Sequence, residues 1–439
     1  MLDQRAWPRV ERLLRFVEQF KRCFHPRLQR VSLRRYLHGL LGESPRKSMQ
    51  AMLARVTDPG HYQALQHFIT HATWDWVPVW RRLWDLIPER EGILIFDDTS
   101  FPKQGRHSVG VARQYCGAVG KVANCQVATT AVLWAHDRAW LLGAALYLPQ
   151  EWTRDRARCA RVGVPATVRF QEKWRLALTL LRRARAAGFT FTAVLADAGY
   201  GDVTVFRQML HRLQLPYAVG ISSDLSVFRG TPRVEAPRPT GRAGRPPTRR
   251  RVGDGQTPQP ARSLVADLPA TAWRPITWRN GQQPTRWRAE FAAVRVTPAH
   301  RWRRGHLLPE VWLLAQRAIG STTPTRFFFV HLPATTPLRR LVALAHQRWA
   351  IEQQYQHLKD ELGLDHFEGR SYPGWHRHVV LTAVAYTFLQ CERRRARRPV
   401  TFPAVRALVG EVFTALYFAA HPKQLDYLIE LRTHLPLRI

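Results

Sequence analysis

Apolar residues recur at helical spacing near the start of the chain. The first series recurs every three or four residues and consists of Leu13, Phe16, Val17, Phe20 and Phe24. Residues 62–69 carry a similar pattern. This spacing predicts a helical region over residues 1–90. Arginines cluster between the two apolar series. They fit two interpretations that stay open here, the solvated face of a helix bundle and a domain that binds DNA ends.

The pattern changes after residue 90, where short apolar runs alternate with helical stretches. Residues 92–96 form a short apolar run that is typical of a buried strand, residues 189–196 also have a strand-like pattern, and both segments lead into aspartate. Residues 125–148 have the pattern of antiparallel strands, and residues 170–187 that of an amphipathic helix. This alternation predicts an α/β core whose first part spans residues 91–225.

A polar stretch and a strand-rich stretch follow this first part of the core. Residues 230–262 are rich in proline, glycine and arginine, which predicts a flexible basic loop or a solvated linker. Tryptophan, arginine and β-branched residues alternate over residues 264–332, a pattern that is typical of strands. We therefore expect a basic linker and a β-rich insertion over residues 226–335.

The last part of the chain, residues 336–439, carries helical patterns. Thr336 is suited to cap a helix and Pro337 to occupy its first position, and Gly363 is a suitable end for that long helix. Two further helices are predicted, over residues 375–391 and 403–433.

The charge of the chain changes the functional picture most. The 439 residues include 67 Lys and Arg against 32 Asp and Glu, a formal net charge of +35. Such an excess repels itself unless a polyanion shares the space, and nucleic acid is the leading partner. An anionic membrane surface is the alternative, but no amphipathic anchor stands out. The five cysteines form no CxxC pair, and we find neither a signal peptide nor 18 consecutive apolar residues, so we expect a cytoplasmic protein at the bacterial chromosome.

Three carboxylates have positions that suit metal chemistry. Asp98 and Asp197 follow apolar strands, and Glu352 lies on the predicted long helix. A carboxylate buried at a strand end needs compensation, which Mg²⁺ provides together with water and phosphate oxygens. Two such ions can activate the attacking oxygen and stabilise the leaving oxygen in phosphoryl transfer. Taken singly, each aspartate also fits an ordinary turn and the glutamate an exposed helix face.

The first candidate carboxylate, Asp98, has an alternative in the residue next to it. Asp97 and Asp98 are adjacent, so their side chains point to opposite faces of a strand. Only one of them faces the other two acids. Asp97 therefore stays an alternative to Asp98, and a hydrogen bond to the neighbouring backbone would be its structural role.

Three segments surround the candidate carboxylates in order along the chain: DDTSFPKQGRHSVGVARQYCGAVGKVANCQ, VLADAGYGDVTVFRQMLHRLQLPYAVG and QRWAIEQQYQHLKDELGLDHFEGRSYPGWHRH. Together they resemble the corresponding segments of DDE insertion-sequence transposases with an RNase H-like core. The helix that holds Glu352 resembles a Tyr–Arg–Glu–Lys signature of that family, matched by Arg348, Glu352 and Lys359 but with Ala345 in the tyrosine position. The resemblance covers roughly residues 60–390.

This resemblance implies an α/β fold, an RNase H-like mixed-sheet core with a helical N-terminal domain and a β-rich insertion. It implies that Asp98, Asp197 and Glu352 bind Mg²⁺, with Mn²⁺ as a substitute, and catalyse cleavage at transposon ends and strand transfer into target DNA. The expected partner is double-stranded DNA, bound by a homodimer and not at a membrane. The DNA-binding residues expected on this basis are Arg348, Lys359, Lys103, Arg106 and Arg113.

Two other functions remain open at this point. A domesticated, non-catalytic DNA-binding protein would keep the basic surface, and a DNA nuclease would cleave without joining. In relatives, an aromatic residue of the insertion stacks on a flipped base, so Trp287, Trp302 and Trp312 are candidates for that role, with ordinary packing as the alternative.

Overall fold

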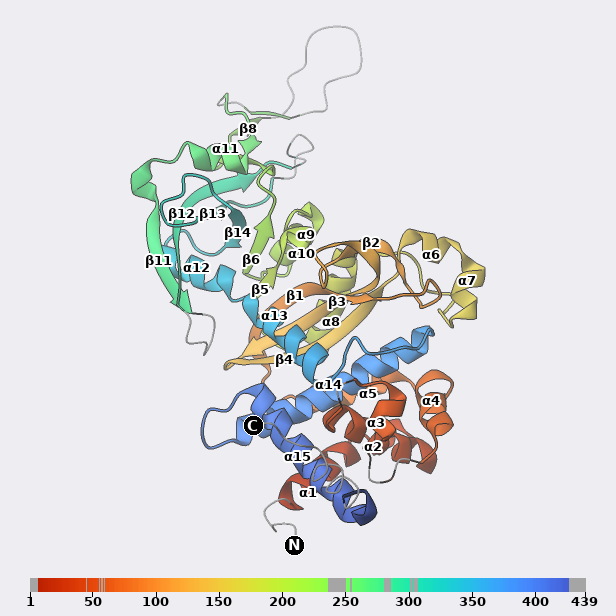
Figure 1. The fold of residues 1–439 in the computed structure, drawn as a ribbon. Helices are drawn as coiled ribbons and strands as arrows, with labels where there is room; N and C mark the ends of the chain where they lie inside the picture. Colours follow the sequence, from red (N-terminus) through yellow and green to blue (C-terminus); the bar gives the residue numbers. More distant parts are fainter. Residues whose placement is uncertain are drawn as a thin grey trace, which may run out of the picture.

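One mixed β-sheet runs through the molecule (Figure 1). The computed structural model describes residues 7–44, 46–54, 56, 58, 60–235, 250–252, 255–279, 286–300, 302 and 307–425. Among these residues, twelve strands form the large sheet, in the order β10-β7-β12-β13-β14-β6-β5-β1-β3-β2, with β11 beside β12 and β4 beside β3. A short pair, β8 (Val234–Glu235) and β9 (Arg251–Val252), lies apart from it.

The central strands have the mixed topology expected of an RNase H-like core. Strand β1 pairs in parallel with β5 and antiparallel with β3, and β5 pairs in parallel with β6. The predicted α/β fold is confirmed. These strands are β1 (Glu91–Pro102), β2 (Ala112–Cys116), β3 (Lys121–Ala135), β4 (Arg138–Tyr147), β5 (Thr190–Ala196) and β6 (Tyr217–Ile221).

The strands of the region predicted as an insertion continue the same sheet. Strand β14 pairs antiparallel with β6 and thereby joins them to the core. Much of the predicted basic loop, residues 236–249 and 253–254, lies outside the described residues. The strands are β7 (Ser226–Arg229), β10 (Gln259–Pro260), β11 (Arg274–Arg279), β12 (Arg286–Pro298), β13 (Val311–Arg317) and β14 (Arg326–His331); the short helix α11 (Ala261–Ala266) and the turn η2 (Ala270–Ala272) lie among them.

Helices cover both faces of the core strands. On one face lie α8 (Lys173–Ala186), α9 (Ala198–Gly201) and α10 (Thr204–Arg212), preceded by the short α6 (Gln150–Arg154) and α7 (Arg156–Arg161). On the other face lie α12 (Leu338–His346), α13 (Trp349–Gln356), η4 (His357–Glu361) and α14 (Tyr372–Arg395). Two separate apolar clusters fill these two layers.

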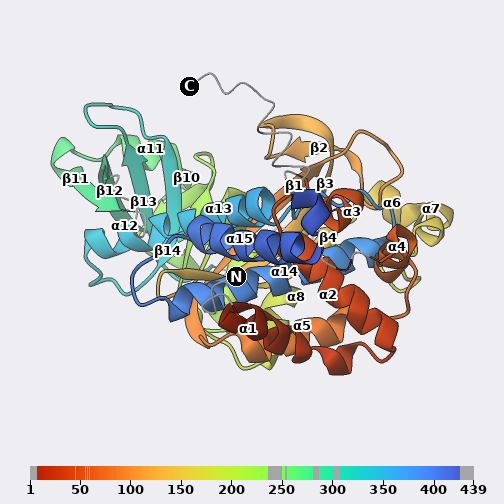
Figure 2. The same ribbon diagram turned by 60° about the horizontal axis from the view of Figure 1, so that its bottom comes forward.

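The first and last helices of the chain form one layer (Figure 2). Helix α14 packs against helices from the beginning of the chain and is buried along most of its length. The layer consists of α1 (Trp7–Glu18), η1 (Lys21–Cys23), α2 (Arg27–Leu41), α3 (Met49–Leu53), α4 (Tyr62–Thr70), α5 (Trp76–Leu86), α14 and α15 (Phe402–Ala420). The helical character predicted for the start of the chain is therefore observed.

The long helix predicted from Thr336 is divided in two. Helix α12 begins at Leu338 after Pro337, without a side-chain cap, so the capping prediction for Thr336 was wrong. Helix α12 packs on β6, β12 and β14, whereas α13 packs on β1 and β4. Because these strands belong to different parts of a twisted sheet, one straight helix does not reach both. The predicted end is confirmed, since Gly363 has a positive φ of 64°.

The last predicted helix is interrupted at His421, and residues 422–425 are helical again. Helix α15 stops at Ala420, where His421 leaves the helical conformation and Pro422 follows. Residues 426–433 of the prediction lie outside the described residues. By length and composition alone α15 is apolar enough to cross a membrane, but 39% of that stretch is buried in the molecule. It also contains Arg406 and Glu411, so it is weak evidence for a membrane span.

Candidate active site

Strand β1 carries its two adjacent aspartates on opposite faces of the sheet. Leu94 and Phe96 pack in the apolar cluster that contains α8 and α10, and Ile95 packs in the cluster that contains α13 and α14. The alternation of a strand then places Asp98 on the face of α8 and Asp97 on the face of α13.

The carboxylate of Asp98 is fixed by three groups from three elements. The buried Tyr200 hydroxyl of α9 donates a hydrogen bond to Oδ1 at 2.6 Å, and the Thr129 hydroxyl of β3 donates to the same oxygen at 3.1 Å. The ammonium of Lys173, the first residue of α8, lies 2.8 Å from Oδ2. A cation and two hydroxyls therefore hold Asp98 in one orientation.

Arg348 joins Asp97 to the glutamate helix. Its Nη1 donates to Asp97 Oδ2 at 2.7 Å, and its Nη2 donates to Glu352 Oε1 at 2.7 Å. The other oxygen of Asp97 accepts from the backbone N–H of Asp98 at 2.9 Å, the structural role considered for it. Burial raises the pKa of Asp97 to about 7, as do the charges of Asp197 and Asp98, whereas Arg348 lowers this pKa.

Asp197 directly follows β5 and is half-buried. Burial raises its pKa, the nearby charge of Asp98 raises it further, and Arg348 opposes both effects. Its Oδ1 is buried without a hydrogen-bond partner among the described residues. An unsatisfied buried carboxylate oxygen is costly, so this atom is a strong candidate for binding a cation.

The chain approaches itself closely behind Asp197. A Cβ atom on Gly201 would lie 1.8 Å from the carbonyl oxygen of Gly220, and one on Gly220 would lie within 3.5 Å of the Asp197 backbone. Only glycine leaves room for the short helix α9 against β6. These two positions therefore set where Asp197 and Tyr200 lie.

A cleft of about 950 Å³ brings two of the three predicted acids together. It lies between the ends of β5 and β6, helices α12 and α13, and strands β11 and β12. The side chains that meet across it are Asp197, Arg348, Glu352, Trp278, Trp287 and Arg288. Asp97 and Asp98 are not among the residues that line the cleft. The charge of Asp98 acts on Asp197, and Asp97 accepts a hydrogen bond from Arg348, which does line the cleft.

The three candidate tryptophans have different surroundings. Trp287 lines the cleft and is 48% exposed. Trp302 packs edge-on against Phe228, and Trp312 lies under Arg295 with its indole N–H donating to a backbone carbonyl. Only Trp287 of the three therefore lines the cleft beside Glu352.

The carboxylates of the site are suitable ligands for a hard divalent cation, although in this structure they form ion pairs with basic side chains of the protein. Among the described residues, no three His, Cys, Asp or Glu side chains are gathered closely enough to hold a metal ion. Arg348 and Lys173 instead contact the carboxylates. Carboxylate oxygens, including the unsatisfied one of Asp197, are the ligands that Mg²⁺ prefers. Asp98, Asp197 and Glu352 therefore fit the ion in type, with Asp97 as the alternative to Asp98.

The predicted DNA-binding residues fall into two groups. Lys359 donates to the backbone carbonyl of Ser100, and Lys103 donates to that of Phe367, so both partly buried lysines connect chain segments. Lys359 lies in the π-helical turn η4, so it does not continue the regular α-helical spacing of Arg348 and Glu352. The side chains of Arg106 and Arg113 are exposed, and Arg348 bridges the two acids described above.

Sequence reasoning missed the groups that position the acids. Tyr200 follows Asp197 in Ala-Gly-Tyr-Gly, a segment interpreted only as a turn. The hydroxyl of Tyr355, one turn beyond Glu352, lies 2.6 Å from that of Thr130. Tyr200 had a recognisable signal, a tyrosine next to a catalytic candidate, whereas Lys173 had none, because only folding brings it to Asp98.

The sheet order and the acidic strand ends define the class of RNase H-like α/β proteins. Within it, the chain belongs to the DDE superfamily endonucleases, whose family profile matches residues 19–285. It is also 29% identical over 225 residues to the probable transposase for insertion sequence element IS701 of Microchaete diplosiphon, which covers 50% of this chain and 56% of that protein. The chain thus matches little more than half the length of this relative. The family match includes Asp98 and Asp197 and ends before Glu352.

Proposed function

We propose that this protein is a transposase that cleaves DNA at transposon ends and joins the freed 3′-hydroxyl to target DNA. The observation that carries the proposal is the cleft lined by both Asp197 and Glu352, in which Asp197 Oδ1 is buried and unsatisfied and the charge of Asp98 acts on Asp197. Membership of an endonuclease superfamily and similarity to a probable transposase support the same function.

Each acid has a distinct role in this proposal. Asp98, Asp197 and Glu352 would hold Mg²⁺, or Mn²⁺ in its place, which when bound activates the attacking oxygen and stabilises the leaving oxygen. Tyr200 and Thr129 orient Asp98 through hydrogen bonds. Burial of Asp197 at the strand end keeps it in a fixed position.

The cationic side chains would bind the phosphates of the DNA. Arg348 presents a planar guanidinium at the mouth of the cleft, suited to bind a phosphate in two places once the acids bind metal. The exposed Arg106 and Arg113 would contact the DNA backbone. Trp287, at the rim of the cleft, would stack on a base of the transposon end. A homodimer on double-stranded DNA would bring two ends together.

The test of this proposal is cleavage of a supercoiled plasmid that carries the element's ends, with Mg²⁺ or Mn²⁺. We expect nicked and linear products from the wild-type protein and their loss in Glu352→Gln. Glu411→Gln, the same change at an exposed glutamate of α15, serves as the matched control. Absence of cleavage, or cleavage that Glu352→Gln leaves unaffected, contradicts the proposed mechanism and favours a non-catalytic DNA-binding protein.

Strand transfer needs its own measurement. Incubating pre-cleaved ends with a target plasmid separates joining from cutting, because only a transposase produces covalent end–target joints. Hydrolysed ends without joints would identify a nuclease instead.

A further inference from the structure

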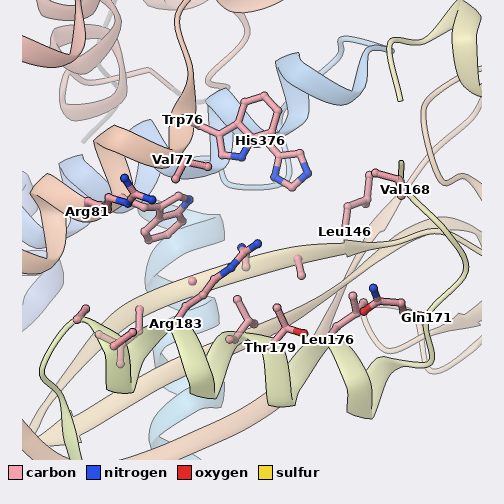
Figure 3. A pocket seen from close by; sticks show the side chains of 18 of the residues that line it. Trp76, Val77, Arg81, Leu146, Val168, Gln171, Leu176, Thr179, Arg183 and His376 are labelled. Atoms are coloured by element: carbon pink, nitrogen blue, oxygen red, sulfur yellow. The ribbon is translucent and has the colours of Figure 1, made fainter. Parts of the chain in front are cut away.

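A second large cavity lies outside the catalytic cleft, between the N-terminal helices and the core (Figure 3). Its volume is about 820 Å³, within the roughly 300–1,000 Å³ of typical small-ligand sites. Helix α5 forms one wall, α8 the opposite wall, and strand β4 the floor. We call it the Trp76 groove, defined by Trp76, Trp80, Trp84, Leu176, Thr179 and Arg183.

The floor of the groove is a sheet edge. Residues Leu142, Gly143, Ala144 and Ala145 of β4 line it, and among the described residues β4 pairs with β3 alone. Three of these residues, Gly143, Ala144 and Ala145, have no side chain or a small one, so the groove reaches down to the backbone there. The indole N–H of Trp84 donates to the Leu142 carbonyl. The neighbouring backbone thus offers both donors and acceptors to a planar polar ligand.

Two polar side chains enter the groove without partners. Arg183 rises from α8 towards His376 and Trp76 (Figure 3), and its exposed guanidinium forms no ion pair or hydrogen bond with any described residue. His376 is 7% exposed, and its Nε2 is buried without a hydrogen-bond partner among the same residues. The buried, unsatisfied imidazole nitrogen indicates a hydrogen-bonding ligand, and the exposed guanidinium beside it favours one that is also anionic.

Aromatic rings surround these polar groups. Trp76 stacks on His376, with ring centroids 4.7 Å apart and planes 8° from parallel. Burial, together with the charge of Arg183, lowers the pKa of His376 to about 3, so the ring is neutral and has one donor and one acceptor nitrogen. Rings and a neutral donor–acceptor pair suit a nucleobase, whose faces stack and whose edges form hydrogen bonds.

Charge and position favour DNA over an acidic peptide. Arg81, Arg169 and Arg183 line the groove against the single acid Asp85, which Arg82 already pairs. The end of the groove at Gln171 lies two residues before Lys173, whose ammonium contacts Asp98. One end of the groove therefore lies close in the chain to the lysine that contacts Asp98.

We propose that the Trp76 groove binds one unpaired nucleotide of a DNA strand, with its phosphate on Arg183 and its base among Trp76, His376 and the edge of β4. The inference rests on the proposed function, because it takes the bound strand to be part of the DNA that the enzyme cuts. The groove differs in residues and elements from the cleft at Trp287.

The binding test uses the full-length protein without divalent metal and a single-stranded oligonucleotide that carries one 2-aminopurine. We expect quenching of the 2-aminopurine fluorescence on binding. Arg183→Gln should weaken the affinity roughly tenfold, because it removes the charge-assisted contact to phosphate. Arg185→Gln is the matched control, since Arg185 is exposed on the same helix and does not line the groove. Equal affinities of the two variants would overturn the proposal.

Photocrosslinking locates the bound base. An oligonucleotide with 5-iodouracil should crosslink to a peptide containing Trp76 or Trp80, and Arg183→Gln should reduce that product. Crosslinks confined to other peptides, or competition by a duplex or an acidic peptide that equals that of the single strand, would refute an unpaired nucleotide. Because no cleavage is required, a catalytically inactive protein that still crosslinks at Trp76 supports the groove and refutes only the proposed catalysis.

Discussion

The two faces of strand β1 hold neighbouring aspartates in different ways. On the α8 face, Asp98 has two hydroxyl donors and the flexible ammonium of Lys173. On the α13 face, Asp97 has its own backbone and the planar guanidinium of Arg348, which also binds Glu352. The hydroxyls orient Asp98 without neutralising it, whereas the contacts of Asp97 form a bridge between strand and helix. This difference suits Asp98 to metal binding and Asp97 to holding the glutamate helix in place.

The largest expected effect separates the two aspartates. Asp98→Asn should reduce the rate of DNA cleavage at least roughly 10³-fold, since it removes a metal-binding charge. Asp97→Asn should reduce that rate no more than about tenfold, because the amide still bonds the Asp98 backbone and only the bridge to Arg348 weakens. Single-turnover cleavage at saturating Mg²⁺ measures both. A greater loss in Asp97→Asn would make Asp97 the first metal ligand.

The next effect concerns the close approach behind Asp197. Gly201→Ala should lower the free energy of unfolding by about 2–3 kcal/mol, because its Cβ would overlap the Gly220 carbonyl oxygen and force the backbone apart. Gly105→Ala is the control, since a Cβ there meets nothing within 4 Å. Urea unfolding followed by circular dichroism measures the two. Equal stabilities would mean that α9 and β6 separate without cost, and Asp197 would then not be rigidly placed.

The two tyrosines near the aspartates, Tyr200 and Tyr355, provide a finer comparison. Tyr200→Phe removes a hydroxyl that donates directly to Asp98, so it should raise the Mg²⁺ concentration for half-maximal cleavage roughly tenfold. Tyr355→Phe removes a hydroxyl that contacts Thr130 instead, so its shift should stay within about twofold. Titrations of the cleavage rate with Mg²⁺ test this order. The reverse order would assign the metal to the α13 face.

The smallest expected effect has the opposite sign. Lys173→Met removes a half-exposed cation that competes for Asp98, so Mn²⁺ should bind about threefold more tightly. Lys121→Met, an exposed change on β3, should leave Mn²⁺ affinity unaltered. Isothermal titration measures both variants. Weaker binding in Lys173→Met would show that this lysine positions Asp98 and does not compete for it.

Local signals in the sequence predicted much of the fold. The apolar runs before Asp98 and Asp197 are strands β1 and β5, and Gly363 ends the helical segment after Glu352. These features depend on residues that are close in sequence and on a fixed periodicity, so local sequence patterns predict them. The opposite orientation of Asp97 and Asp98 followed from the same period.

Contacts between segments that are distant in sequence could not be predicted from such local patterns. Lys173 reaches Asp98 only because α8 packs on β3 and β4, and nothing in its own neighbourhood indicates that partner. The division between α12 and α13 follows from the different strands on which they pack. Strands expected in a separate insertion extend the core sheet through β14 and β6, since the strand edge of β6 was available for pairing.

The central claim is that Asp98, Asp197 and Glu352 together bind the divalent ion. Electron paramagnetic resonance of Mn²⁺, titrated into the protein bound to an uncleavable DNA end, tests it most directly. The account predicts tightly bound Mn²⁺ in the wild-type complex and its loss in Asp98→Asn, Asp197→Asn and Glu352→Gln, with Asp97→Asn retaining it. Tight Mn²⁺ binding that persists in all three variants, or that disappears only in Asp97→Asn, would contradict the account.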